Sequence, residues 1–134
     1  MLHLVKLAVG IRDVGHLAAV QQARAAADPP LRHLTRNMPR RAAEILAGGS
    51  IYWSIAGTIL VRQRILAIEP ATRLDGTGCT ALVLDPALVR VAGQPMKPFQ
   101  GWRYLRAEDA PPDLAEEVAG TGEMEAALRA LGLL

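Results

Sequence analysis

The stretch GGSIYWSIAGTILVRQRILAIE, residues 48–69, decides the fold class. After the paired glycines, apolar residues recur with a period of two, and β-branched and aromatic residues are frequent, which is typical of strands. We therefore expect two strands, 50–56 and 58–69, joined tightly at Ala56-Gly57. Such a hairpin favours a positive φ at Gly57, a conformation that glycine adopts without steric cost.

Further strands are expected on both sides of this hairpin, where short apolar segments are bounded by turn residues. The DGTG turn before residue 78 is a hairpin signal for the strand that follows it. The expected strands are 2–9, 31–36, 78–84, the ALVRV segment 87–91 and the FQGWRYL segment 99–105.

Helices are expected where capping residues flank apolar positions. Asp13 offers an N-cap for a helix that runs through about Ala27 and stops at the DPP segment. NMPRRAAEILAGG predicts a helix of about two turns that ends at the glycines 48 and 49. Two short helices, 113–119 and 123–131, are expected to close the chain.

These elements predict a single α+β domain over residues 1–134, since a chain of 134 residues is typical of one domain. The expected architecture is a mostly antiparallel sheet with short flanking helices at its ends or on one face. A barrel-like closure of the sheet is the alternative arrangement.

The charge is unevenly distributed along the chain. Residues 32–106 hold eleven bases and four acids, net +7, whereas residues 107–134 hold one base and seven acids, net −6. A basic body (1–106) followed by an acidic helical segment (107–134) suggests an anionic partner for the body. The alternative is that the acidic segment docks on the basic one.

The composition favours a cytoplasmic protein without a membrane partner. The chain has one cysteine, Cys79, so no intrachain disulfide forms, which fits a reducing compartment. Its N-terminal stretch MLHLVKLAVG lacks the features of a signal peptide. No run of eighteen apolar residues predicts a membrane span.

Two arginine-rich places are candidate anion sites. In a strand from 58 to 69, Arg62 and Arg64 project from one face, either toward a ligand or as edge arginines covering apolar neighbours. Gln63 points the other way, where its amide needs partners. Arg40 and Arg41 stand at a helix start, where they either bind an anion or pair with Glu44.

The aromatic residues all lie in the basic segment, and three of them are candidates for base stacking. In FQGWRYLR, Trp102 and Tyr104 share one face of a strand, and Arg103 takes the other. Aromatic rings beside arginines suit contacts with bases and phosphates. Tyr52 is the third candidate for stacking, and the alternative for Trp53 and Trp102 is a place in the core.

No catalytic or metal site emerges from the spacing of reactive residues. The three histidines have no metal-ligand spacing, and Cys79 has no CxxC partner. Ser50 lacks the G-x-S-x-G elbow of hydrolases. We therefore assign no catalytic residue, metal or cofactor.

Several longer motifs carry a family resemblance. LRHLTRNMPRRAAEILAGGSIYWSIAGTILVRQRILAIE, LVLDPALVRV and KPFQGWRYL are similar to an uncharacterised bacterial family, domain of unknown function 1489. The matching positions are His33, Thr35, Arg36, Pro39, Arg41, Gly49, Ser50, Tyr52, Trp53, Gly57, Arg62, Gln63, Asp85, Pro86, Gln100, Gly101, Trp102, Arg103 and Tyr104. The family name implies no activity. A fainter resemblance in layout to PUA/ASCH-like barrels implies RNA or nucleotide binding.

The resulting hypothesis is a non-catalytic module that binds RNA or another nucleic acid, or a nucleotide, through a basic face containing aromatic residues. The anion-binding candidates are Arg36, Arg40, Arg41, Arg62, Gln63, Arg64 and Arg103, and the stacking candidates are Tyr52, Trp102 and Tyr104. The alternatives are an enzyme on a small anionic or nucleotide substrate, with Arg62, Gln63 and His33 lining its pocket, or a partner-binding domain. The sequence leaves open the ligand, the occurrence of catalysis and the oligomeric state.

Overall fold

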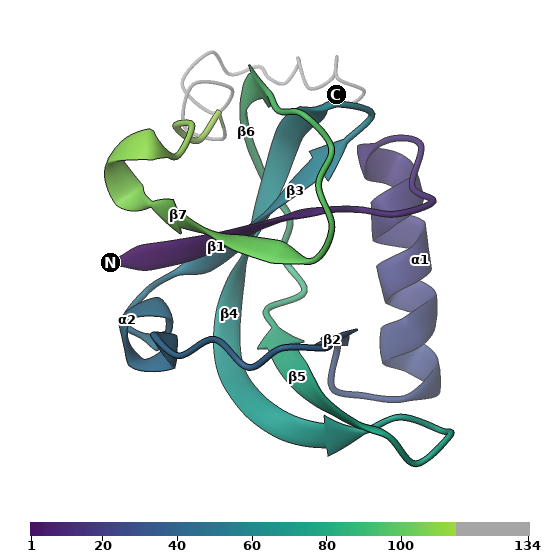
Figure 1. Cartoon of the computed structure of the whole chain (residues 1–134). Helices are drawn as coiled ribbons and strands as arrows, with labels where there is room; N and C mark the ends of the chain where they lie inside the picture. The colour runs from purple at the N-terminus through teal and green to yellow at the C-terminus, as the bar shows by residue number, and fades with distance from the viewer. Residues whose placement is uncertain (115–134) are drawn as a thin grey trace.

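The computed structural model describes residues 1–114 and contains seven strands and two α-helices in that range (Figure 1). The strands are β1 Leu2–Leu7, β2 Arg32–Thr35, β3 Ser50–Ile55, β4 Thr58–Thr72, β5 Gly78–Leu84, β6 Val89–Pro95 and β7 Trp102–Arg106. The helices are α1 Val14–Ala27, α2 Ala42–Leu46 and the short 3₁₀ helix η1 Ala107–Asp109.

The expected hairpin is the centre of the sheet. β3 and β4 pair antiparallel, and the turn between them has a positive φ at both Ala56, 52°, and Gly57, 87°. The prediction for Gly57 is therefore confirmed. β4 is 15 residues long and visibly bent, so its first half pairs with β3 and β6 and its second half pairs with β5 (Figure 1).

The strand order is β2-β5-β4-β3-β1-β7, with β6 added beside β4. Within residues 1–114 every pair of strands is antiparallel except β1 with β3. The α+β class with a mostly antiparallel sheet is confirmed. The barrel-like alternative is not confirmed, because β2 and β7, the strands at the two ends of the strand order, do not pair with each other.

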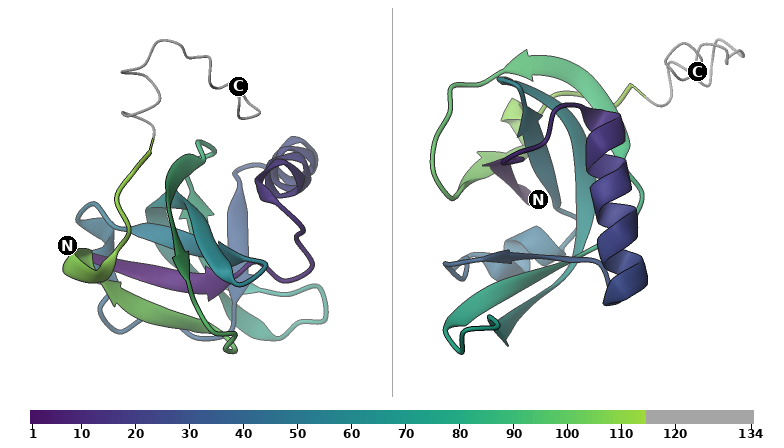
Figure 2. Two further views of the ribbon diagram at one scale, coloured as in Figure 1. Left: turned by 90° about the horizontal axis from the view of Figure 1, so that it is seen from above. Right: turned by 90° about the vertical axis from the view of Figure 1, so that its right-hand side faces the viewer.

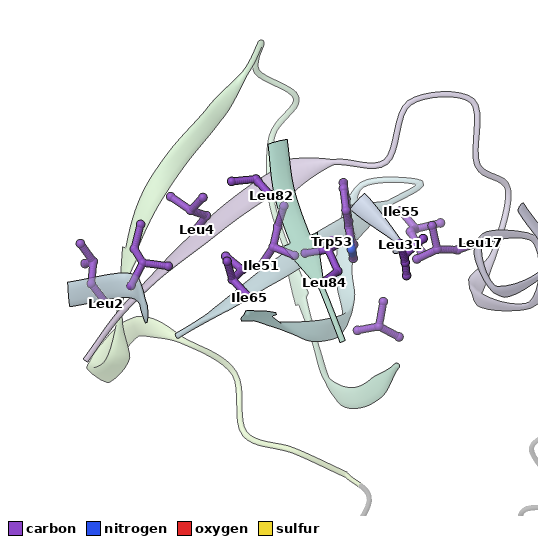
Figure 3. Close-up of a cluster of buried hydrophobic side chains, with 12 residues drawn as sticks. Leu2, Leu4, Leu17, Leu31, Ile51, Trp53, Ile55, Ile65, Leu82 and Leu84 are labelled. Carbon is purple, nitrogen blue, oxygen red and sulfur yellow. The ribbon is translucent and has the colours of Figure 1, made fainter. Parts of the chain in front are cut away.

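Apolar clusters lie on both sides of the sheet. One cluster joins Trp53, Ile65 and other strand residues to Leu17 of α1 and Ile45 of α2 (Figure 3). α1 lies along this side of the strands in both views of Figure 2. The other cluster gathers Tyr52 and Leu105 with residues of β6 and the segment after it. The central strands are therefore buried on both faces, which explains why β3 is an unbroken buried run.

The helix α1 begins and ends as the sequence predicts. Asp13 is its N-cap, and the side chain accepts a hydrogen bond of 2.7 Å from the backbone N–H of His16. The helix ends at Ala27, just before the Asp28-Pro29-Pro30 segment. Within residues 1–114, no helix is long and apolar enough to cross a membrane.

The helix α2 is shorter than expected, with five residues, and Arg40 and Arg41 precede it. Its C-terminal end is closed by a hydrogen bond of 2.6 Å from the backbone N–H of Gly49 to the Ile45 carbonyl. A Cβ atom at Gly49 would clash with the carbonyl oxygens of Leu2 and Ile45. Glycine is therefore required there for the close approach of two backbones.

The expected C-terminal helices, 113–119 and 123–131, lie almost entirely outside the described residues. Asp113 forms an isolated β-bridge with Val91, so the segment is extended where the first of these helices was expected to begin. Three backbone groups of 110–114 are bonded: Pro112 accepts from Ala92, Leu114 donates to Arg90 and Ala110 donates to Ala107.

Replacement of Ala56 tests the hairpin turn. Ala56 is exposed, and its positive φ is unfavourable for a residue with a Cβ atom but well suited to Asn before Gly. We expect Ala56→Asn to raise the free energy of unfolding by about 0.5 kcal/mol, and Ala56→Val to lower it by about 1 kcal/mol. Urea denaturation measures both values, and equal effects of the two variants would contradict this account of the turn.

Candidate functional site

Gln63, an expected ligand-binding residue, is part of the core. It is 0% exposed, and its side-chain oxygen accepts from Gln21 and from the indole of Trp53, both at 2.8 Å. Its amide nitrogen donates to Gln21 at 2.7 Å and to the carbonyl of Asp85 at 3.1 Å. The hydrogen-bond partners that a buried amide needs are therefore supplied here by Gln21, Trp53 and Asp85. Gln63 joins α1 to the sheet, and it does not face a ligand.

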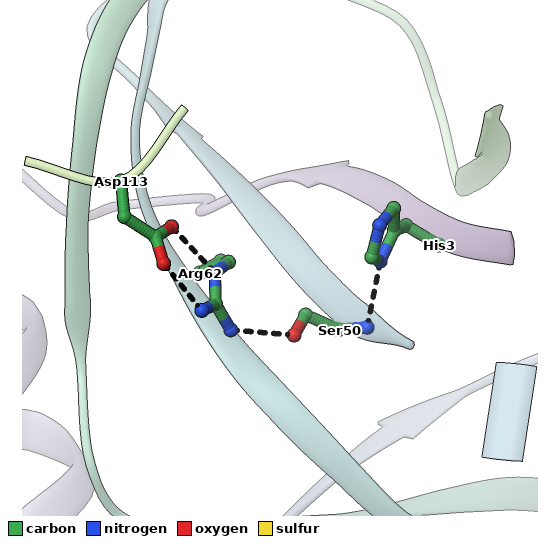
Figure 4. A network of polar contacts seen from close by, with 4 residues as sticks. All are labelled: His3, Ser50, Arg62 and Asp113. Carbon is green, nitrogen blue, oxygen red and sulfur yellow. Dashed lines mark hydrogen bonds and ion pairs between the residues drawn. The ribbon is translucent and has the colours of Figure 1, made fainter. Parts of the chain in front are cut away.

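Arg62 is held in a polar network on the other face of β4 (Figure 4). Its guanidinium donates to both carboxylate oxygens of Asp113, at 2.8 and 2.6 Å, and to the hydroxyl of Ser50 at 3.0 Å. The backbone N–H of Ser50 donates to Nδ1 of His3 at 3.0 Å. Neither sequence alternative for Arg62 describes this arrangement, because the arginine anchors the segment that carries Asp113.

These residues line a hollow of about 360 Å³ together with Tyr52. Burial, followed by the charge of Arg62, lowers the pKa of His3, and burial raises the pKa of Tyr52. Both side chains are therefore neutral at pH 7. His3 Nδ1 accepts from the backbone amide of Ser50, and the Ser50 hydroxyl accepts from Arg62, so within residues 1–114 no hydrogen bond joins this hydroxyl to a base. This geometry is not that of an activated serine nucleophile.

Arg64 shares a face of β4 with Arg62 and is exposed. Among residues 1–114 it has no ion-pair partner. The helix start with Arg40 and Arg41 lies on the opposite side of the sheet, where α2 packs. The guanidiniums of residues 40, 41, 62 and 64 therefore do not converge on one site.

The structure does bring together the 36–41 loop and β7. The indole N–H of Trp102 donates to the Asn37 carbonyl at 3.0 Å. The backbone N–H of Arg41 donates to the hydroxyl of Tyr104 at 3.2 Å, and the Arg41 guanidinium lies 5.5 Å from the centre of that ring. Trp102 and Tyr104 are in edge-to-face contact, with ring centres 5.0 Å apart.

We call the 36–41 loop, which carries Arg36, Arg40 and Arg41, together with Trp102 and Tyr104 of β7 the basic–aromatic face. Tyr104 is 36% exposed on this face, whereas Trp102 is partly buried against the core. Arg41 forms two hydrogen bonds of 2.7 Å with Glu44, as one sequence alternative predicts. Arg36 and Arg40 have no ion-pair partner within residues 1–114 and are exposed.

Two other candidates, Arg103 and Tyr52, lie apart from this face, as does Trp53. Arg103 is on the opposite side of β7, with its guanidinium 4.4 Å from the centre of the Phe99 ring. Tyr52 is buried beside His3, with ring centres 5.0 Å apart, and is not placed for base stacking. Trp53 is a core residue, which agrees with one of the two sequence alternatives.

Two members of the Arg62 network were not expected as site residues. The alternation Leu2-His3-Leu4 contains a signal for His3, because it sets the imidazole on the face opposite the two leucines. Asp113 carries no such signal, since its partner is 51 residues away in sequence. Among residues 1–114, no three His, Cys, Asp or Glu side chains gather as metal ligands.

The fold and the site define a class of α+β protein with an open, mostly antiparallel sheet and a basic surface that contains aromatic residues. The chain belongs to the family described as "Protein of unknown function (DUF1489)", whose model matches residues 4–134. No curated protein and no solved structure matches it.

Substitution of Gln63 tests the buried amide network. Gln63→Met keeps the volume but leaves the Trp53 indole, the Gln21 amide and the Asp85 carbonyl without a partner. We expect a loss of about 2–4 kcal/mol in the free energy of unfolding. Gln22→Met, at an exposed neighbouring position of α1, is the control and should cost less than about 0.5 kcal/mol. A Gln63→Met protein as stable as the control would refute a structural role.

Substitution of Arg62 tests the anchor for the segment around Asp113. We expect Arg62→Met to lower the free energy of unfolding by about 1–2 kcal/mol, and Arg64→Met, on the same face, to change it by less than about 0.5 kcal/mol. Equal stability of the two variants would contradict the anchoring role.

The same ion pair predicts a dependence on pH. The hydrogen bonds from Arg62 hold the pKa of Asp113 below its usual value, so folding favours the ionised carboxylate. This contribution is present above about pH 4, the unfolded pKa of Asp, and is lost as pH falls through the folded pKa. Urea unfolding at several pH values should show less of this acid sensitivity in Arg62→Met, and an unchanged pH profile would contradict the prediction.

Proposed function

We propose that this protein is a cytoplasmic module that binds single-stranded nucleic acid, RNA in particular, through the basic–aromatic face. The observation that carries the proposal is the pair of hydrogen bonds that lays the arginine-rich loop across Trp102 and Tyr104. The two bonds join this loop to aromatic residues more than 60 positions away in sequence, and the Arg41 guanidinium lies 5.5 Å from the centre of the Tyr104 ring.

Each part of the face has a chemical role in this proposal. Arg36 and Arg40 are free to contact phosphate, because neither has a carboxylate partner within residues 1–114. The exposed part of Tyr104 offers a surface for one base, and stacking of this kind is worth about 1–3 kcal/mol per base. The Arg41 guanidinium lies against the ring of Tyr104 and also forms an ion pair with Glu44, which partly neutralises its charge.

The charge of the described part supports the same proposal. Residues 1–114 hold fourteen bases and nine acids, net +5. A basic surface attracts a polyanion over several ångströms and makes its affinity dependent on salt. The single cysteine is the reason to place this activity in the reducing cytoplasm.

The enzyme alternative is less well supported, because its three expected residues do not meet in one pocket. Gln63 is enclosed in the core, Arg62 is paired with Asp113, and His33 packs edge-to-face against Trp53. The partner-binding alternative relies on the acidic segment 107–134 or on the apolar C-terminus, and residues 115–134 lie outside the described residues.

Fluorescence anisotropy with a labelled single-stranded RNA tests the proposal. We expect Arg40→Ala to weaken binding about tenfold at low salt and to reduce the slope of log affinity against log salt by about 0.7, one phosphate contact. Tyr104→Leu should weaken binding with little change in that slope, since it removes stacking and keeps the charge. Tyr104→Phe keeps the ring and should bind more tightly than Tyr104→Leu.

Arg90→Ala is the matched control, because this substitution removes the same charge as Arg40→Ala. Arg90 is exposed on β6 and lies outside the basic–aromatic face. The control should leave the affinity within about twofold. Equal losses for Arg40→Ala and Arg90→Ala would mean that only net charge matters and would overturn the proposed face.

A further inference from the structure

A second basic region lies between α1 and the sheet, on different residues from the basic–aromatic face. A cleft of about 220 Å³ is lined there by Lys6 of β1, Arg24 of α1 and His33 of β2, with Leu17, Leu31 and Trp53 among the apolar walls. We call it the α1 cleft. It adjoins a wider hollow of about 450 Å³, which also touches Arg24, Leu31 and His33.

Two of the three cationic side chains that line the α1 cleft, Lys6 and Arg24, have no ion-pair partner within residues 1–114, whereas the third, Arg32, is paired with Asp28. Among the described residues, no acidic side chain lines the cleft. Asp28, at the adjoining hollow, is bonded to Arg32 at 2.7 Å. Positive charge from β1 and α1 therefore lines a cleft in which the described residues supply no counterion for Lys6 or Arg24.

Lys6 is the most unusual of these bases, because it is partly buried. The strand register sets it between Trp53 of β3 and Trp102 of β7, on the face that α1 covers. Burial lowers the pKa of its amine. A partly buried ammonium without a carboxylate partner is costly for the fold, and a bound anion would remove that cost.

His33 adds a neutral polar group to the same wall. Its Nε2 atom is enclosed and has no hydrogen-bond partner within residues 1–114. The ring packs edge-to-face on Trp53, with centres 5.1 Å apart. Burial, and then the charges of Lys6 and Arg24, lower the pKa of His33 to about 4, so the imidazole is uncharged at pH 7.

We propose that the α1 cleft binds a small organic anion, with an oxyanion head between Lys6 and Arg24 and an apolar body against Leu17, Leu31 and Trp53. The head is a carboxylate or a phosphate monoester, which share the chemistry that an ammonium and a guanidinium recognise. The volume of about 220 Å³ lies below the range of about 300–1,000 Å³ for drug-sized ligands, so a body of about one ring is expected.

The test uses the two lysines of the chain, Lys6 and Lys97, as reporters in one sample. Reductive methylation with ¹³C-formaldehyde labels both amines and keeps their charge. Lys97 is exposed and lies outside the cleft, so it is an internal control. The probes are benzoate, phenyl phosphate and inorganic phosphate. Inorganic phosphate has the oxyanion group but lacks the apolar ring.

Saturable movement of the Lys6 resonance with benzoate or phenyl phosphate, and a rise in the pKa of the Lys6 amine on binding, are expected, with Lys97 unmoved. Inorganic phosphate should bind at least tenfold more weakly than the tighter organic anion. The tighter of the two organic probes identifies the head. Equal responses of Lys6 and Lys97, or equal affinity for inorganic phosphate and the organic probes, would overturn the proposal.

Variants complete the test. Lys6→Met should weaken organic-anion binding at least tenfold, and Lys97→Met should leave it unchanged. Arg24→Gln, at an exposed helix position, provides a second cleft variant in case Lys6→Met fails to fold, and it should also weaken binding. An unchanged affinity of Arg24→Gln for the organic anions would show that the Arg24 guanidinium does not bind them, and it would contradict the proposal. RNA binding at the basic–aromatic face is measured separately, so failure of either site is distinguishable from failure of the other.

Discussion

The buried amide of Gln63 is the constraint on which the packing of this protein depends. One side chain in the bent strand β4 satisfies Trp53 of β3, Gln21 of α1 and the carbonyl of Asp85 after β5. A buried polar group without partners is costly, so these elements must meet at one point for any of them to be stable. This requirement orients α1 on the sheet and thereby shapes the cleft between them.

A second constraint acts on the opposite face of the sheet. Arg62 and Asp113 form an ion pair with two hydrogen bonds, and the neighbouring backbone of the 110–114 segment bonds to β6. The segment lies beside the cluster that contains Tyr52, Val91 and Leu105, with Ala110 packed against it. The arginine that most resembles a ligand residue in the sequence therefore stabilises the chain itself. Its charge is matched by Asp113, and this distinguishes it from Arg36 and Arg40.

The two proposed sites follow from the same principle, that positive charge without a carboxylate partner is available to a ligand. On the basic–aromatic face, the arginines are exposed beside Tyr104, which suits a flexible polyanion with stacking bases. In the α1 cleft, Lys6 is partly buried among apolar side chains, which suits a small anion with an apolar body. The two ligand classes differ because the two surfaces differ in depth and in apolar area.

Local pattern was sufficient for most elements of the fold. The period of two in residues 50–69, the Ala56-Gly57 turn and the Asp13 cap depend on neighbours in sequence, and the hairpin and α1 form where these signals stand. The strand alternation also indicated that the Gln63 amide needs hydrogen-bond partners, but it did not identify the residues that supply them. Tertiary contacts alone selected Gln21 as a partner, paired Arg62 with Asp113, and placed Arg41 against Tyr104. These pairs are 42, 51 and 63 residues apart, and a periodicity that spans a few residues carries no information about which distant side chain will satisfy a buried amide or a guanidinium.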